Sequence, residues 1–155
     1  MNMPTIEQTQ TLPISLDQAW RFLSDPKNLS TITPPELGFQ IASKVPSEMY
    51  EGLIITYRIT PMLGIPMTWV SEIAHMRAPY YFVDRQLCGP YRYWHHEHEL
   101  REVEGGVEMS DRINFGMPFG PFGHVAYLLF VKRQLNHIFS FRRKVLEEKF
   151  TASLK

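Results

Sequence analysis

Two histidines and an aspartate are the residues of this sequence best suited to chemistry. His96 and His98 alternate along one expected strand, so both imidazoles lie on the same face of it. Asp111 lies on the next expected strand, which would pair with the first. Imidazoles beside a carboxylate can transfer protons, hydrogen-bond to a ligand or bind a metal ion.

A hairpin that turns at Gly105-Gly106 would bring these three residues together. In that register Asp111 lies one diagonal step from His98, and Glu99 faces Arg112. An opposite-charge pair suits a solvent-exposed face, so we expect the other face of the hairpin to be buried. That face collects Trp94, His96, His98, Leu100, Met109, Asp111, Ile113 and Phe115.

Buried imidazoles and carboxylates need partners, because burying them without hydrogen bonds is costly. Four interpretations stay open: a core network that satisfies itself, a polar anchor for a ligand, acid–base catalysis with a histidine as proton carrier, and metal binding. His96, His98 and Asp111 are the catalytic candidates, and none is assigned a catalytic role. Only Asp111 offers a third metal ligand, so we expect no metal and no cofactor.

Two polar residues on the preceding strand have an undecided direction. If Gly89-Pro90 forms a two-residue turn, Val83 faces His96 and the side chains of Asp84 and Gln86 point outward. A three-residue turn or a bulge would reverse them and add both to the polar cluster.

The elements that position these residues follow from periodicity and turn signals. We expect an initial strand over 3–12, a short helix that begins after Ser15 with Gln18 in a capping box, and a helix stop at Asp25-Pro26. A second short helix covers 27–32. Six more strands follow, joined by short turns that favour an antiparallel meander: 37–45, 52–60, 66–76, 80–88, 91–103 and 106–116.

A single long amphipathic helix is predicted from Pro121 or Phe122 to about residue 150. It is long enough to cross the concave side of a curved sheet, where its apolar residues would either form ordinary core or line a cavity. This apolar stripe comprises Val125, Leu128, Leu129, Leu135, Ile138, Phe139, Val145 and Leu146. Its basic residues are expected on a solvated face, or alternatively on a surface that binds an anion or a partner: Lys132, Arg133, Arg142, Arg143 and Lys144.

Two expected loops, 61–66 and 117–122, are unusually apolar for surface segments. They are interpreted as the rim of a cavity, a contact for a possible homodimer, or a membrane-touching patch. The residues expected to line a ligand cavity are Trp94, His96, His98, Asp111, Ile113, Phe115, Met62, Leu63, Phe119, Leu128 and Leu135.

Composition narrows the class of protein. The 155 residues are 44% hydrophobic, which is enough for one packed domain over 1–155. Sixteen basic residues balance sixteen acidic ones, so the net charge gives no overall attraction to nucleic acid or to an anionic bilayer, and we expect no nucleic-acid partner. The one cysteine, Cys88, excludes an internal disulfide and indicates a reducing compartment. With no signal peptide and no bilayer-length apolar run, we expect a cytoplasmic protein without stable membrane insertion.

Several short motifs along the chain form a recognisable set: residues 12–20 (LPISLDQAW), 82–86 (FVDRQ), Gly89-Pro90, Trp94-x-His96-x-His98, 110–112 (SDR) and 120–123 (GPFG). In these motifs the chain resembles the SRPBCC superfamily, the START and Bet v1-like helix-grip proteins, and within it the small bacterial stand-alone members related to polyketide cyclases/dehydrases. The resemblance implies an α+β fold in which a seven-stranded antiparallel sheet grips a C-terminal helix around an apolar cavity. It implies no single activity.

The resulting functional expectation is the binding or carriage of a small hydrophobic molecule, such as a lipid, an isoprenoid or a polyketide-like compound. A cyclase/dehydratase-type lyase with His96 or His98 as general base is the first alternative. A dimerising interaction module is the second. The sequence leaves open which molecule is bound and whether any reaction is catalysed.

Overall fold

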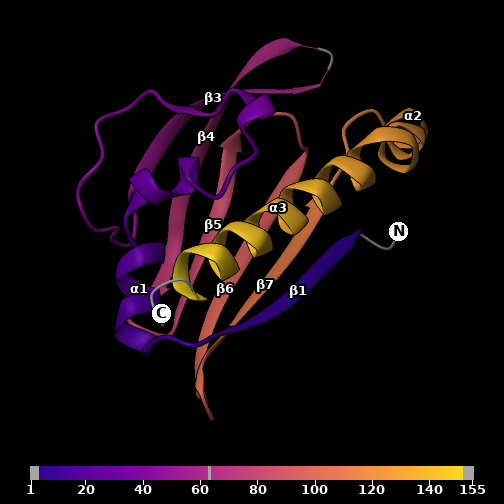
Figure 1. Cartoon of the computed structure of the whole chain (residues 1–155). Coiled ribbons are helices and arrows are strands. Elements are labelled where there is room, and N and C mark those ends of the chain that lie inside the picture. The colour runs from indigo at the N-terminus through magenta and orange to yellow at the C-terminus, as the bar shows by residue number, and fades with distance from the viewer. Residues whose placement is uncertain (1–3, 63, 152–155) are drawn as a thin grey trace.

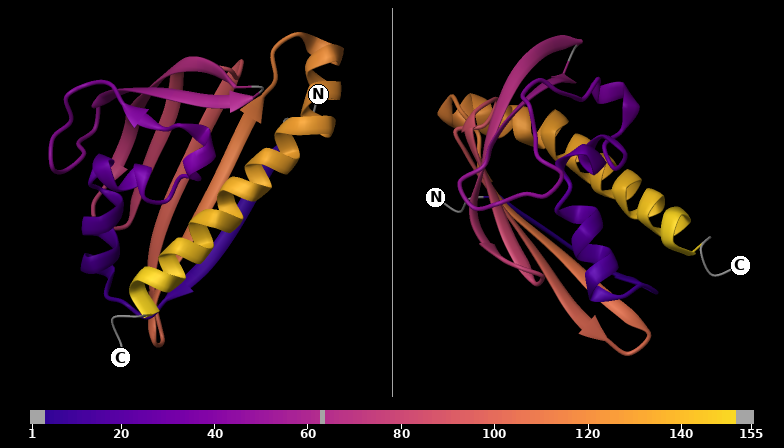
Figure 2. Two further views of the ribbon diagram at one scale, coloured as in Figure 1. Left: turned by 45° about the horizontal axis from the view of Figure 1, so that its top comes forward. Right: turned by 90° about the vertical axis from the view of Figure 1, so that its left-hand side faces the viewer.

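Seven antiparallel strands form one curved sheet, and a long C-terminal helix crosses its concave face (Figures 1 and 2). The computed structural model describes residues 4–62 and 64–151, without the side chains of Met62 and His124. The strands lie in the order β1-β7-β6-β5-β4-β3-β2. This architecture is the predicted α+β helix-grip fold.

The strands are β1 (Thr5–Leu12), β2 (Gln40–Ile41), β3 (Ile54–Met62), β4 (Ile65–Arg77), β5 (Tyr81–Cys88), β6 (Tyr93–Val103) and β7 (Gly106–Gly116). The α-helices are α1 (Leu16–Leu23), α2 (Gly120–Ala126) and α3 (Lys132–Thr151). Two 3₁₀ helices, η1 (Pro26–Ser30) and η2 (Pro35–Leu37), follow α1, and a π-helical turn, η3 (Tyr127–Val131), joins α2 to α3. Among the described helices, none combines the length and the apolar content needed to span a bilayer.

The capping box predicted for α1 is confirmed. The Ser15 hydroxyl accepts a hydrogen bond from the Gln18 backbone at 3.2 Å, and the Gln18 side chain accepts one from the Ser15 backbone at 3.0 Å. These contacts satisfy amide groups that the helix cannot pair internally. They fix where α1 begins and thereby direct the apolar side of this helix toward the sheet.

The β6–β7 hairpin forms with a register two residues away from the predicted one. Val103 pairs with Gly106, and His98 lies directly opposite Asp111 instead of one diagonal step away. Glu97, not Glu99, faces Arg112. A shift by an even number of residues keeps every side chain on its predicted face, which is why the predicted buried face is right although the pairing is wrong.

The strand predicted over 37–45 is wrong except for two residues, Gln40–Ile41. Pro35–Leu37 forms η2 instead, and Gly38 ends it in the left-handed conformation with φ 55°. Beyond β2, the amides of Ala42 and Ser43 both donate to the Thr56 carbonyl, so the ladder is interrupted there. The segment between α1 and β3 thus forms a strand of the sheet only at β2. Most of it arches over the sheet, where it can cover a cavity (Figure 1).

The predicted C-terminal helix is present, but its apolar stripe is wrong near the N-terminal end. Val125, Leu128 and Leu129 are exposed, because α2 and η3 extend beyond the part of the sheet that α3 covers (Figure 1). The π turn also changes the helical phase there. Together with other exposed apolar side chains they form a surface patch: Phe119, Phe122, Val125, Leu128, Leu129 and Phe130.

Candidate functional site

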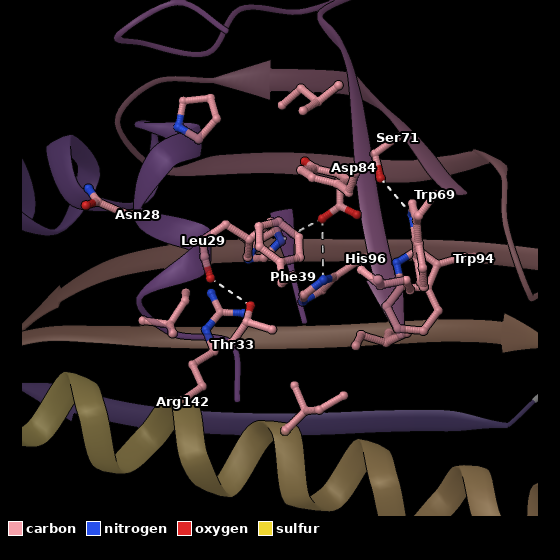
Figure 3. A pocket seen from close by; sticks show the side chains of 18 of the residues that line it. Asn28, Leu29, Thr33, Phe39, Trp69, Ser71, Asp84, Trp94, His96 and Arg142 are labelled. Atoms are coloured by element: carbon pink, nitrogen blue, oxygen red, sulfur yellow. Dashed lines mark hydrogen bonds and ion pairs between the residues drawn. The ribbon is translucent and has the colours of Figure 1, made fainter. Parts of the chain in front are cut away.

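A cavity of about 220 Å³ lies between the sheet, α3 and the segment that carries η1 and η2 (Figure 3). Its walls are largely apolar. Phe22 and Leu29 contribute from the helical segment, Ile55 and Ile73 from β3 and β4, and Leu135 from α3. Such walls favour an apolar guest over water.

Five charged or titratable side chains gather at one side of this cavity. Asp84, His96, His98 and Arg142 line it, and Asp111 lies buried directly behind the histidines. Strand pairing places them together, because Asp84 faces His96 across β5–β6, and His98 faces Asp111 across β6–β7. Arg142 reaches the same place from α3, on the opposite wall (Figure 3).

Each carboxylate contacts both imidazoles. Asp84 Oδ2 lies 2.9 Å from His98 Nε2 and 3.4 Å from His96 Nδ1. Asp111 Oδ1 lies 3.0 Å from His96 Nε2, 2.9 Å from His98 Nδ1 and 3.3 Å from Arg142 Nη1. The two imidazole rings lie with their centroids 3.8 Å apart. The histidines are therefore enclosed between two aspartates.

Two buried atoms of this cluster lack a hydrogen-bond partner within the described residues. They are His98 Nδ1, which lies close to Asp111 without hydrogen-bond alignment, and Arg142 Nε. Unpaired buried polar atoms are uncommon in folded proteins and call for a specific explanation. A bound group that completes these contacts is one such explanation.

The electrostatics of the cluster separate the two histidines. Burial lowers the pKa of His96, and the neighbouring His98 charge adds to this effect. Burial also opposes the charged form of His98, but its contacts with Asp111 and Asp84 prevail and raise its pKa. One imidazolium, formed at His98, is thus favoured over two.

Both carboxylates ionise readily despite their burial. Burial alone would raise the pKa of Asp84, but the charge of His96 and the hydrogen bond from His98 outweigh it and lower the pKa. Burial also opposes ionisation of Asp111, yet the Arg142 charge and the two histidines hold its pKa well below the usual range. Two carboxylates, Arg142 and one imidazolium together carry no net charge.

Five of the predicted site residues line the cavity: Trp94, His96, His98, Ile113 and Leu135. Asp111 contacts both histidines from behind. Phe115 is fully buried in the core beside Trp94 and is not among the lining residues. Phe119, at 83% exposure, and Leu128, at 56%, lie on the surface patch away from the cavity. Leu63 and the side chain of Met62 lie outside the described residues.

Asp84 and Gln86, whose side-chain directions the sequence left open, differ in what they contact. Asp84 points into the cavity, because the β5–β6 connection is longer than two residues and Asp84 pairs with His96 where Val83 would otherwise stand. Gln86 instead bonds the connection itself: its side chain donates to the Tyr91 carbonyl at 2.6 Å and accepts from the Tyr91 amide at 3.3 Å.

Arg142 and Tyr57 are among the polar residues of the cavity that sequence reasoning missed. Arg142, expected on a solvated face, is only 7% exposed. A signal was present, since Leu135, Phe139, Arg142 and Leu146 follow helical spacing along the buried side of α3. Tyr57 lines the cavity as well, and burial, helped by the Asp84 charge, raises the pKa of its hydroxyl, which therefore stays protonated.

The cluster also contains a set of atoms suited to a metal ion. One donor atom from each of Asp84, His96 and His98 lies within 4.8 Å of the other two. Two imidazoles and a carboxylate are a common ligand set for zinc and for divalent iron. The arrangement can thus hold a polar group of a ligand, move a proton or bind a cation.

Solved structures share this fold. Protein Ms6760 from Mycobacterium smegmatis superposes with a TM-score of 0.70 at 15% identity, over 99% of this chain and 98% of that one. The protein TTHA0849 from Thermus thermophilus gives 0.69 at 14% identity, over 98% and 100%. Ara h 8.0201 gives 0.61 at 14% identity, over 94% and 98%. No protein-family model matches the chain, and no curated protein does. The likeness is therefore one of fold.

Proposed function

We propose that this protein binds a small, largely apolar molecule that carries one uncharged polar group, such as a hydroxyl or a carbonyl. The observation that carries the proposal is the distribution of side chains around the cavity of about 220 Å³. Apolar residues form most of the wall, and the charged cluster of Asp84, His96, His98 and Arg142 occupies one side. Ligand sites combine the same two features.

Cavity volume limits the size of the molecule. The cavity measures about 220 Å³. This is below the ~300–1,000 Å³ of sites for drug-sized ligands. Among lipids, isoprenoids and polyketide-like compounds, a compact molecule of one or two rings fits better than a long-chain lipid.

The balance of charge within the cluster limits the polar group. Asp84 and Asp111 already contact the imidazoles, and Asp111 also contacts Arg142, so an additional ionised group would be buried among charges that already have partners. A hydroxyl or carbonyl needs only hydrogen bonds. Asp84 can accept one. The protonated Tyr57 hydroxyl can donate, and so can Arg142 Nε, which has no partner among the described residues.

The first test uses 1-naphthol and naphthalene, which differ by one hydroxyl group. A hydrogen bond to a charged group contributes about 1.5–3 kcal/mol. We therefore expect isothermal titration calorimetry to show 1-naphthol binding at least tenfold more tightly than naphthalene. Native mass spectrometry of freshly purified protein should also reveal a one-to-one apolar ligand. Failure of both compounds to bind, with no copurified molecule, would overturn the proposal.

A cavity-filling variant provides the second test. Ile113 lines the cavity next to His96, and it is 1% exposed, so the extra atoms of Ile113→Phe have mainly the cavity to enter. We expect this variant to lose most 1-naphthol affinity, at a stability cost of about 1–3 kcal/mol. Phe122→Ser, on the exposed patch, is the matched control and should bind as the wild type does.

Acid–base catalysis is a second candidate function, favoured by the short contact between His98 and Asp84 inside the cavity. Such a pair could remove a proton from a carbon beside a carbonyl, which is a step of cyclases and dehydratases. A turnover that persists unchanged in a folded His98→Ala variant would exclude the histidine from catalysis.

A further inference from the structure

We propose that Asp84, His96 and His98 bind one divalent transition-metal ion, with Zn²⁺ as the reference case, and that Asp111 orients both imidazoles. The proposal does not depend on the organic ligand, since the metal can be measured alone. It rests on donor geometry, on the number of protons the cluster needs and on the partners of the distal ring nitrogens.

Donor geometry is the first argument. Ligand atoms about 2.1 Å from a tetrahedral or octahedral ion stand about 3.0–3.4 Å apart. Asp84 Oδ2 lies 2.9 Å from His98 Nε2 and 3.4 Å from His96 Nδ1. The donor atoms of all three residues lie within 4.8 Å of one another, so side-chain shifts on the order of 1 Å would bring them to the spacing that a single ion needs.

Proton accounting is the second argument. Both nitrogens of each imidazole lie within 3.4 Å of a carboxylate oxygen. A neutral imidazole carries one N–H and one lone pair, so His96 can donate from Nε2 to Asp111 and keep the lone pair of Nδ1 toward Asp84. With the N–H of His98 on Nδ1, the lone pair of its Nε2 also points toward Asp84. Both rings can therefore be neutral with one free nitrogen each beside Asp84, which is the form of histidine that binds a metal ion.

The far side of the rings is the third argument. Histidines that bind a metal usually donate their other N–H to a carboxylate, which fixes the ring orientation. Here Asp111 Oδ1 lies 3.0 Å from His96 Nε2 and 2.9 Å from His98 Nδ1. Arg142 Nη1 in turn lies 3.3 Å from the same oxygen. His98 Nδ1, which lacks an aligned partner among the described residues, would gain one after a small ring rotation.

Three protein ligands leave at least one coordination position for another group. All three line the cavity, so that position faces its interior (Figure 3). With both rings neutral, two carboxylates, Arg142 and a divalent ion sum to one positive charge. The open position therefore suits a hydroxide or the polarised oxygen of a ligand's hydroxyl or carbonyl group.

The test is metal binding by the intact chain after dialysis against a chelator. We expect calorimetry and elemental analysis to show one Zn²⁺ per chain, and Co²⁺ to give visible absorption bands. Asp84→Asn and His98→Gln should abolish this site, and Asp111→Asn should weaken it by about 10–100-fold. His75→Gln is the matched control, because His75 contacts Glu51 at 3.1 Å in an exposed pair and should leave binding unchanged.

A measurement on the unmodified chain covers the case of variants that do not fold, as judged by circular dichroism. Ring-nitrogen NMR of the six histidines should show Zn²⁺ shifting Nδ1 of one residue and Nε2 of another. The proposal is overturned if the wild type binds no metal, if folded Asp84→Asn and His98→Gln bind as well as His75→Gln, or if the NMR shifts fall on other histidines.

Discussion

At the scale of single residues, the stability of the cluster depends on mutual compensation. Asp111 is buried with two imidazoles and the Arg142 guanidinium within 3.3 Å. Ion pairs of this kind need not be worth more than apolar packing, but removing one partner leaves the other charge buried and uncompensated. The members of the cluster should therefore be much less tolerant to single changes than surface charges.

Asp111→Asn tests this compensation. The variant leaves the Arg142 charge buried without its carboxylate, so we expect a loss of about 3–5 kcal/mol in the free energy of unfolding. Urea denaturation measures it. Glu108→Gln is the matched control, since Glu108 pairs with the exposed Arg101 at 2.6 Å, and it should cost less than about 1 kcal/mol.

A double variant tests whether the loss of stability comes from an uncompensated charge. Asp111→Asn combined with Arg142→Met removes both members of one pair, so no uncompensated charge remains between them. We expect the double variant to lose less stability than the sum of the two single losses. Additive losses would contradict the coupling inferred from the 3.3 Å contact.

At the scale of elements, the pairing of β5, β6 and β7 sets the relative positions of the side chains in the cluster. His96 and His98 alternate on β6, and each neighbouring strand supplies one aspartate at the paired position. The turn between β6 and β7 fixes this alignment. Gly106 belongs to this turn and leaves no room for a side chain, because a Cβ at this position would lie 2.0 Å from the Leu12 carbonyl oxygen on β1.

Gly106→Ala and Gly105→Ala form a matched pair at this turn. Both glycines have positive φ, 155° and 83°, but a Cβ on Gly105 would have open space around it. We expect Gly105→Ala to cost about 1–2 kcal/mol for the backbone conformation alone. Gly106→Ala should cost clearly more, since β1 must also move. Thermal denaturation of both variants measures the difference, and equal losses would contradict it.

At the scale of the whole molecule, the cavity exists because α3 and the arched segment after α1 close over the sheet (Figure 2). Two contacts join α3 to the cavity wall. Gln134 donates to the Pro61 carbonyl on β3, and His137 contacts Glu36 on η2, in the arched segment, in an exposed pair. Gln134 and Pro61 themselves line the cavity, so this border is the expected route for ligand exchange.

Glu36→Gln should accelerate that exchange. An exposed ion pair contributes at most about 1 kcal/mol, so we expect 1-naphthol to dissociate up to about fivefold faster, with little change in stability. Stopped-flow fluorescence measures the rate. The control is Glu148→Gln, which removes an exposed pair with Lys144 elsewhere on α3. Equal rates in both variants would place the exchange route elsewhere.

The elements and the faces of the strands could be predicted from the chain alone, because both depend on local periodicity and turn chemistry. Alternation placed Trp94, His96 and His98 on a buried face, and this conclusion survived a register error of two residues. The Ser15 capping box could also be predicted from the sequence. The extent of β2 could not be predicted, because the conformation of Gly38 and the interrupted ladder depend on the arched segment that covers the sheet.

Asp84 and Arg142 reach the histidines only through the tertiary structure. The direction of Asp84 depends on the length of the β5–β6 connection, where one residue reverses a strand face. Arg142 is separated from Asp111 by 31 positions in the numbering, and their contact follows from how α3 crosses the sheet. Local patterns specify which way a side chain points, whereas partners distant in sequence meet only through the packing of whole elements.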